Sequence, residues 1–137
     1  MRVLEFFLEN PLKPDYAASI AKKLKMSKVA VLSALKALQG AGIIAGKSFG
    51  RAVFFSFNAS NPVAKQLKIA RTVSILSSKL GKLDASGASV FFYGSAARGE
   101  DSEKSDLDLL AVGGERGLVS KISSALGHDS RVRITFF

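Results

Sequence analysis

Two aspartates separated by one residue stand at the start of an apolar run in the second half of this 137-residue chain. They are Asp106 and Asp108, and the run continues through Val112. In an extended strand, residues two apart point to the same face, so the two carboxylates would place four oxygen atoms on one side. Mg²⁺ accepts hard oxygen ligands of this kind when the phosphates of a nucleotide complete its coordination. Asp106 and Asp108 are therefore candidate metal ligands, although an Asp-x-Asp pair by itself more often lies on a solvated strand edge or in a turn.

A glycine–serine pair precedes these aspartates, and ten residues separate Ser95 from Asp106. Gly94 and Ser95 follow the apolar run of residues 90–93, which predicts a short buried strand, and they come just before a predicted helix start. Glycine lets the backbone approach a phosphate without a side chain in the way, and the N-terminus of a helix favours an anion. The pair is therefore a candidate phosphate-binding corner.

The string Gly94–Gly99, followed by Ser105–Leu109, resembles the nucleotidyltransferase superfamily of the DNA polymerase β type. It is most similar to the minimal nucleotidyltransferases of prokaryotes, and the resemblance covers about residues 88–137. It implies a nucleoside triphosphate bound by Gly94, Ser95 and Arg98. It also implies two Mg²⁺ ions shared by Asp106 and Asp108 as the catalytic residues, with an attacking hydroxyl that displaces pyrophosphate in line.

The sequence departs from that family at one position. Members usually supply a third carboxylate from a later strand, and here a predicted helix over 115–126 is followed by the one candidate strand, 131–137. Arg133 stands where the acid is expected. A guanidinium is not deprotonated in a protein and would repel a metal ion, so we expect slow transfer or none. The given sequence stops at Phe137 within this run, and we allow for native sequence beyond it.

The first sixty residues predict three short helices followed by a β-hairpin. An apolar run over 3–8 forms the first helix, and the second begins near Asp15 as its N-cap. Ser27 is placed to cap the third, whose stripe of Val31, Leu35 and Leu38 ends at Gly40. Residues 43–57 then read as two strands around a turn.

This order of elements resembles the winged helix-turn-helix family, on the segments Met26–Val31, Leu35–Leu38 and Ala41–Ile44. In that family the third helix enters the DNA major groove and the hairpin touches the backbone. The resemblance implies DNA contacts from the helix through Lys28, Ser33 and Lys36, and from the wing through Lys47 and Arg51. Lysine suits phosphate better than base edges, so we expect salt-sensitive, mostly non-specific binding. Use of the same fold for protein contacts is the alternative.

Residues 61–82 predict a linking helix. Pro62 suits a helix start, and the apolar residues at spacings of three and four form a narrow stripe of Val63, Leu67, Ala70, Val73, Leu76 and Leu80. We expect this stripe to form a homodimer seam, with packing as an internal strut as the alternative. The predicted fold class is α+β. It comprises a winged-helix domain over 1–60, the linking and dimerisation helix over 61–82, and a small mixed-sheet nucleotidyltransferase-like α/β domain over 83–137.

The charge is shared unevenly between the halves of the chain, whose formal net charge is +9. Residues 1–83 hold 14 basic and 3 acidic side chains, whereas residues 84–137 hold 6 basic and 8 acidic ones. The first half is therefore the part that favours nucleic acid.

Several classes of protein are excluded by composition. The absence of cysteine excludes a disulfide scaffold, a thiolate metal site and a cysteine nucleophile. The longest uncharged stretches are 13 residues, too short for a membrane span, and Glu5 interrupts any signal-like run. His128 is the one histidine and no base is evident for Ser95, so a serine hydrolase is disfavoured. We expect a cytoplasmic protein with no membrane association.

The sequence thus predicts a prokaryotic transcription regulator in which DNA binding is coupled to a nucleotide-binding, degenerate transferase domain. One alternative is an active enzyme that transfers a nucleotide to a protein, an RNA or a small molecule. The other is an antitoxin-like protein that binds a separate helical partner, as minimal nucleotidyltransferases often do.

Overall fold

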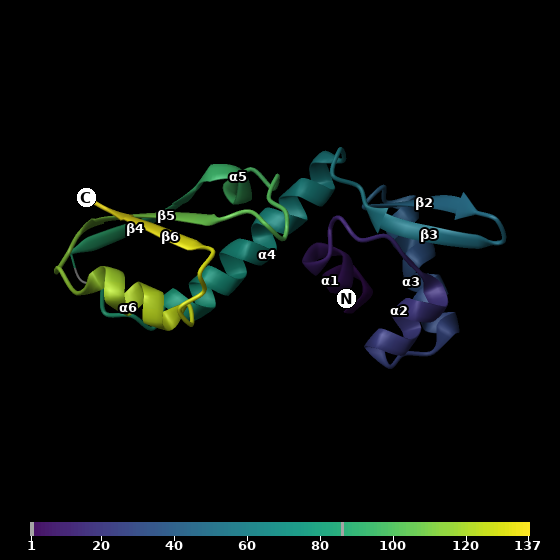
Figure 1. The fold of residues 1–137 in the computed structure, drawn as a ribbon, viewed down its shortest axis with the longest axis horizontal. Coiled ribbons are helices and arrows are strands. Elements are labelled where there is room, and N and C mark those ends of the chain that lie inside the picture. The colour runs from purple at the N-terminus through teal and green to yellow at the C-terminus, as the bar shows by residue number, and fades with distance from the viewer. Residues whose placement is uncertain (1, 86) are drawn as a thin grey trace. The chain divides into compact units, whose positions relative to one another are not determined.

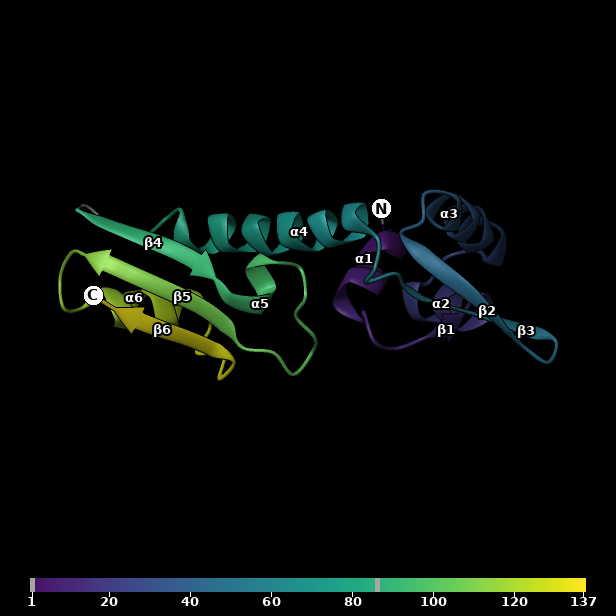
Figure 2. The ribbon, with the colours of Figure 1, turned by 90° about the horizontal axis from the view of Figure 1, so that it is seen from above.

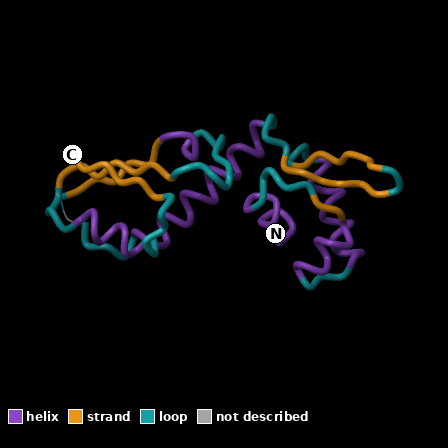
Figure 3. The backbone as a smooth tube through the Cα atoms, viewed as in Figure 1, coloured by secondary structure: helices purple, strands orange, loops and turns teal. Residues whose placement is uncertain are grey.

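The computed structural model describes residues 2–85 and 87–137. The chain forms two compact units, Met1–Leu67 and Lys68–Phe137, and the boundary falls within the long helix α4 (Pro62–Leu80). Each unit has its own hydrophobic core. Figure 3 shows that both units combine helices with a small sheet, which confirms the predicted α+β class.

The first unit has the expected winged-helix arrangement of three helices and a hairpin (Figure 1). Its elements are, in chain order, α1 (Arg2–Glu9), β1 (Asp15–Tyr16), α2 (Ala17–Leu24), α3 (Lys28–Gly40), β2 (Ile44–Phe49) and β3 (Ala52–Phe57). The three strands form an antiparallel sheet in the order β1-β3-β2, and β2 pairs with β3 along its whole length.

Apolar spacing explains how these elements share one core. In α1 the buried residues are Val3 and Phe7, four apart, so they lie on one face of the helix. In α3 the buried pair, Val31 and Leu35, has the same spacing. In β3 the buried residues Phe55 and Phe57 are two apart, as a strand with one covered face requires.

The start of α3 is as predicted. The Ser27 hydroxyl oxygen accepts a hydrogen bond of 3.2 Å from the backbone N–H of Ala30, which has no partner within the helix. The cap fixes where the predicted DNA-reading helix begins.

The predicted N-cap role of Asp15 is wrong. Asp15 lies in strand β1 opposite Phe55, and α2 begins two residues later after Tyr16, whose side chain makes no capping bond. The Asp15 carboxylate instead accepts bonds of 2.6 Å from Lys23 Nζ and 2.8 Å from the Tyr16 N–H. Burial raises the pKa of Asp15, but these bonds outweigh it and leave the pKa below its ordinary value.

The apolar stripe of α4 is divided between the two cores. Ala64 is fully buried in the first core and Leu67 packs against it, whereas Leu76 and Leu80 belong to the second core. Val73 is 44 % exposed. The stripe is therefore mostly used inside each unit, and the homodimer stays a prediction.

The second unit contains a three-stranded mixed sheet, as expected. Its further elements are β4 (Ala88–Tyr93), α5 (Gly94–Ala97), β5 (Leu107–Gly113), α6 (Leu118–Ala125) and β6 (Val132–Phe136). The strand order is β4-β5-β6, with β4 antiparallel and β6 parallel to β5. Parallel neighbours need a crossover connection, which α6 provides on one face of the sheet (Figure 2).

The alternation of β5 determines which side chains face α6. Leu109 and Ala111 are completely buried in a core with Leu118 and Ile122 of α6. Side chains alternate along a strand, so Asp108 lies on the opposite face of the sheet from this core. The candidate chemistry thus lies on the face that α6 does not cover.

Among the residues described, no helix combines the length and apolar character needed to cross a bilayer.

Candidate nucleotidyltransferase site and DNA-binding face

Gly94 and Asp108 are in direct contact in the second unit. Tyr93 pairs with Asp108 across the antiparallel strands β4 and β5, so Gly94 follows immediately beside the carboxylate. Gly94 has a φ of +79°, and a Cβ at this position would collide with Oδ2 of Asp108. Both the left-handed backbone and the close approach therefore require glycine. The structure brings together these two residues of the predicted site.

Arg133 joins the two aspartates from the neighbouring strand. In the parallel register of β5 and β6, Asp108 pairs with Arg133. The guanidinium of Arg133 reaches back to Asp106, with 2.6 Å between Nη2 and Oδ2. The Arg133 side chain is 72 % exposed and that of Asp106 is 32 % exposed. One arginine therefore occupies the edge of the carboxylate pair, and its equivalence to the family's third acid stays a prediction.

The residues present do not fit two divalent cations. A guanidinium 2.6 Å from Asp106 takes an oxygen that a metal ion would need and adds a like charge beside it. In the described part of the chain, no group of three or more histidine or carboxylate side chains is placed to hold a metal ion. The two-cation Mg²⁺ arrangement expected from the resemblance therefore lacks the donor set it needs here.

Ser95 and Arg98 lie at the two ends of the short turn α5. The half-buried Ser95 accepts backbone hydrogen bonds at its carbonyl from Arg98 (3.1 Å) and Glu100 (3.0 Å), which fixes the turn. The exposed Arg98 side chain donates to the Glu100 carboxylate at 2.9 Å. Arg98 is thus held by a neighbouring acid, and its predicted contact with a nucleotide stays a prediction, as does that of Ser95.

A buried ion pair that the sequence analysis missed holds the loop between α5 and β5. Lys68 of α4 has a side chain only 7 % exposed, and its Nζ lies 2.9 Å from Oδ1 of Asp101. Lys68 also donates to the Asp101 backbone carbonyl. The helical pattern placed Lys68 off the apolar stripe, and no local signal connects it with an acid 33 residues away. The pair positions the loop that leads into Asp106.

A polar cavity of about 150 Å³ lies beside Asp106 and is lined by Thr72, Ala96, Asp101, Ser102, Ser105, Asp106, Leu107, Asp129, Arg131 and Val132. Its charges are largely matched within the unit. The Arg131 guanidinium donates to Asp129 at 2.7 Å, and this hydrogen bonding holds the pKa of Asp129 at about 2. The same bond raises the pKa of Arg131. Both groups therefore stay ionised near neutral pH.

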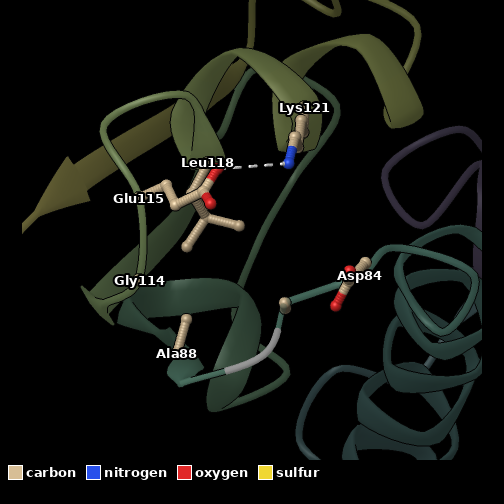
Figure 4. Close-up of a pocket in the computed structure, with 7 residues that line it drawn as sticks. Asp84, Ala88, Gly114, Glu115, Leu118 and Lys121 are labelled. Carbon is tan, nitrogen blue, oxygen red and sulfur yellow. Dashed lines mark ion pairs between the residues drawn. The ribbon is translucent and has the colours of Figure 1, made fainter.

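A second pocket, shown in Figure 4, lies where β4, the end of β5 and the start of α6 meet. Its volume is about 40 Å³, and Glu115 and Lys121 form an ion pair of 3.8 Å at its rim. Ligand pockets in proteins usually enclose several hundred Å³, so this one is too small for a nucleotide.

The predicted DNA contacts of the first unit are all exposed. Lys28, Ser33 and Lys36 lie on α3. Lys47 lies on β2, and Arg51 lies in the hairpin turn. Throughout the part of the chain that the structure describes, none of these four cations pairs with a carboxylate. Lys47 Nζ lies 5.3 Å from the centre of the Phe49 ring. These residues offer positive charge at the surface, and their contacts with DNA stay predictions.

Residues 69–127 match the family model described as "Nucleotidyltransferase domain". The match includes Gly94, Ser95, Asp106 and Asp108, confirms the resemblance predicted from them, and ends before Arg133. A nucleotidyltransferase domain implies the use of a nucleotide and a divalent metal in general. No curated protein matches the chain.

Solved structures similar to this chain include two bacterial proteins. The adhesin competence repressor AdcR from Streptococcus pyogenes is 21 % identical, with 62 % of this chain and 68 % of that chain covered and a TM-score of 0.41. A point mutant of ZitR from Lactococcus lactis is 23 % identical over 93 % of this chain and 72 % of its own, with a TM-score of 0.43. A different point mutant of ZitR, in complex with DNA, has the same identity and coverage and a TM-score of 0.42.

Proposed function

We propose that this protein is a DNA-binding regulator whose second unit is a nucleotidyltransferase-like domain that has lost nucleotide transfer. The first unit binds duplex DNA through α3 and the hairpin of β2 and β3. The second unit binds a nucleotide at the corner of Gly94 and Ser95. The observation that carries the proposal is a difference between the cations of the two units. Among the residues described, the four cations on α3 and the hairpin are exposed and have no carboxylate partner, whereas Arg133 is paired with Asp106.

The DNA-binding role is supported by charge and by fold. The first unit holds ten basic and three acidic side chains, a net charge of +7. Lys28 and Lys36 lie on the helix that winged-helix proteins insert into the major groove, and Lys47 and Arg51 lie on the hairpin that follows the backbone. Cations without carboxylate partners can replace the counterions of DNA phosphates, which drives association.

The loss of transfer is supported by the position of Arg133. Phosphoryl transfer needs positive charge on the phosphates and a base or metal-bound carboxylates near the attacking hydroxyl. Here Asp106 is held by a guanidinium at 2.6 Å, and no acid stands at position 133. The contact between Gly94 and Asp108 preserves the corner that would receive a nucleotide. We therefore retain nucleotide binding in the proposal and leave out a two-cation Mg²⁺ centre.

DNA binding is tested by fluorescence anisotropy with a labelled 20-base-pair duplex of mixed sequence at increasing salt. We expect binding at 50 mM salt and a slope of log affinity against log salt of about −3.6, for four phosphate contacts at about 0.9 each. The absence of binding to any duplex at low salt would overturn the DNA-binding role.

The transfer role is tested with labelled nucleoside triphosphates and Mg²⁺, by looking for nucleotide incorporated into protein or RNA. We expect none from the natural chain. Incorporation that disappears in Asp106→Asn would instead establish an active nucleotidyltransferase, the second candidate, which the preserved contact between Gly94 and Asp108 favours.

The variant Arg133→Asp provides the matched comparison, because it removes the guanidinium and supplies the third carboxylate. We expect it to bind Mn²⁺ about tenfold more tightly than the natural chain, as measured by paramagnetic resonance, since reversing one charge at the surface is worth on the order of 1–2 kcal/mol.

The proposal places the protein in the cytoplasm, where its DNA would be. A homodimer is part of the proposal because winged-helix proteins commonly bind paired half-sites. Light scattering of the natural chain measures its mass and distinguishes a monomer from a dimer. A mass of one chain at all concentrations would remove the dimer, and a separate helical protein partner would then become the leading alternative.

A further inference from the structure

The exposed face of α3 is unusually apolar for a surface helix. Val29 is 77 % exposed and Leu32 is 45 % exposed, although α3 already buries Val31 and Leu35 on its core side. The solvent side of an amphipathic helix is normally polar, so large apolar residues there indicate a contact surface.

These apolar residues share their helix face with the predicted DNA contacts. Val29, Leu32 and Lys36 follow one another at spacings of three and four, which places them on one side of the helix, with Ser33 beside them. The side chains on this face are therefore a mixture of apolar groups and one cation rather than the arginines and amides that read base edges by hydrogen bonds.

A groove in the first unit borders this face and is lined by basic as well as apolar side chains. Its volume is about 440 Å³, and it is lined by Tyr16, Ala17, Ala18, Lys28, Leu32, Arg51, Ala52, Val53 and Phe55. The cations at Lys28 and Arg51, together with the net charge of +7 of the unit, favour a polyanion as the occupant over a neutral or basic protein.

We infer that Val29 and Leu32 select DNA by packing against thymine methyl groups in the major groove, while the neighbouring lysines hold the phosphates. The inference rests on the DNA-binding role proposed above and identifies the class of duplex preferred, one with thymines facing α3. The thymine methyl is the apolar group on the major-groove edge of a base pair, and apolar side chains are its natural contacts.

The test uses the full chain and pairs of 20-base-pair duplexes that differ only by a methyl group. In the first pair, deoxyuridine replaces every thymidine and removes the methyl. In the second pair, 5-methylcytosine replaces cytosine in a G·C duplex and adds a methyl at the same major-groove position. Affinities are measured by anisotropy at 50 mM salt.

We expect the thymine duplex to bind on the order of tenfold more tightly than the uracil duplex, from two methyl groups at about fourfold each. The methylated G·C duplex should likewise bind more tightly than the unmethylated one. The double variant Val29→Ala, Leu32→Ala should lose both differences and keep its salt dependence. The matched variant Leu12→Ala, which removes an exposed apolar side chain outside α3, the hairpin and the groove, should keep both.

The outcomes separate the inference from the proposal it rests on. Failure to bind any duplex overturns the DNA-binding role and the inference with it. Binding that is equal with and without the methyl groups overturns the inference alone and assigns the apolar face to a protein partner. A preference that survives in the double alanine variant overturns the assignment to Val29 and Leu32.

Discussion

The basic side chains on α3 and the hairpin of the first unit differ from many of those in the second unit in whether acids hold them. In the first unit, Lys28, Lys36, Lys47 and Arg51 lie at the surface, and none is paired with a carboxylate among the residues described. In the second unit, acids hold at least five of the ten basic side chains: Lys68 with Asp101, Arg98 with Glu100, Lys121 with Glu115, Arg131 with Asp129 and Arg133 with Asp106.

This difference shows that the number of basic side chains alone does not indicate which part of a chain would meet a polyanion. The two units contain the same number of basic side chains, ten each, and the second unit still carries a net charge of +2 from its eight acids. The pairing within the second unit reduces the charge that its paired cations offer to phosphates. We therefore expect substitutions of the cations on α3 and the hairpin to weaken DNA binding strongly, and substitutions of cations in the second unit to weaken it little.

The largest effect is expected from removing the unpaired cations. The quadruple variant Lys28→Ala, Lys36→Ala, Lys47→Ala, Arg51→Ala should bind duplex DNA at least about a hundredfold more weakly at 50 mM salt, with the salt slope reduced by about 3.6. Anisotropy titration measures both quantities.

A matched quadruple variant provides the control for that result. Arg98→Gln, Lys104→Gln, Arg116→Gln and Lys121→Gln remove the same formal charge from exposed positions of the second unit. We expect its DNA affinity to fall by less than about threefold, because these side chains would attract DNA only over long distances, where salt screens the attraction. Equal losses in the two variants would mean that total charge, rather than its placement, governs binding.

The next largest effect is expected on the stability of the second unit when the buried cation Lys68 is removed. Lys68→Met leaves Asp101 without its partner in a mostly buried setting and should lower the free energy of unfolding by about 2–3 kcal/mol. Amide hydrogen exchange of the buried strand β5 measures this loss. The control Lys121→Met breaks an exposed pair and should change it by less than about 0.5 kcal/mol. Similar values for both would contradict the contrast between buried and exposed pairs.

A smaller effect is expected from two glycines that differ only in their surroundings. Gly94 and Gly50 both have positive φ, but a Cβ at Gly94 meets the Asp108 carboxylate whereas nothing lies within 4 Å at Gly50. Gly50→Ala should cost about 1 kcal/mol from backbone conformation, and Gly94→Ala about 1–2 kcal/mol more because the carboxylate must move. Denaturation followed by circular dichroism gives both values, and equal costs would exclude the close contact.

The smallest effect concerns the one acid of the first unit with a lowered pKa. A carboxyl whose pKa is lower in the folded state stabilises the fold above its unfolded pKa, and this stability disappears as the pH falls through the folded value. Asp15→Asn should therefore reduce stability by about 1 kcal/mol at pH 7, since it weakens the bond with Lys23. The difference from the natural chain should shrink as the pH falls below 3.8, the ordinary pKa of an aspartate. A difference that stays constant with pH would show that Asp15 acts through packing alone.

The sequence predicted the features that depend on residues close together in the chain. The Ser27 cap and the two cores with apolar residues at helical spacing follow from local pattern. The corner of Gly94 beside the strand of Asp108, which depends on the pairing of β4 with β5, was predicted from the family resemblance. The second-unit motifs identified the nucleotidyltransferase domain because their spacing is specific.

Features that depend on pairing between distant residues were not predictable. Asp15 became a strand residue because Phe55, forty residues later, pairs with it. The bond from Lys68 to Asp101 needs the loop after α5 to return to α4. Arg133 was predicted at the position of the missing acid, but its bond with Asp106 depends on the parallel register of β5 and β6, which no local signal encodes.

The decisive experiment is a nitrogen–proton correlation spectrum of the chain titrated with a duplex. We predict that the amides of residues 28–37 and 46–52 shift, while those around Gly94, Asp106 and Arg133 stay in place. Shifts confined to the second unit, with α3 and the hairpin unchanged, would contradict the assignment of DNA binding to the unpaired cations.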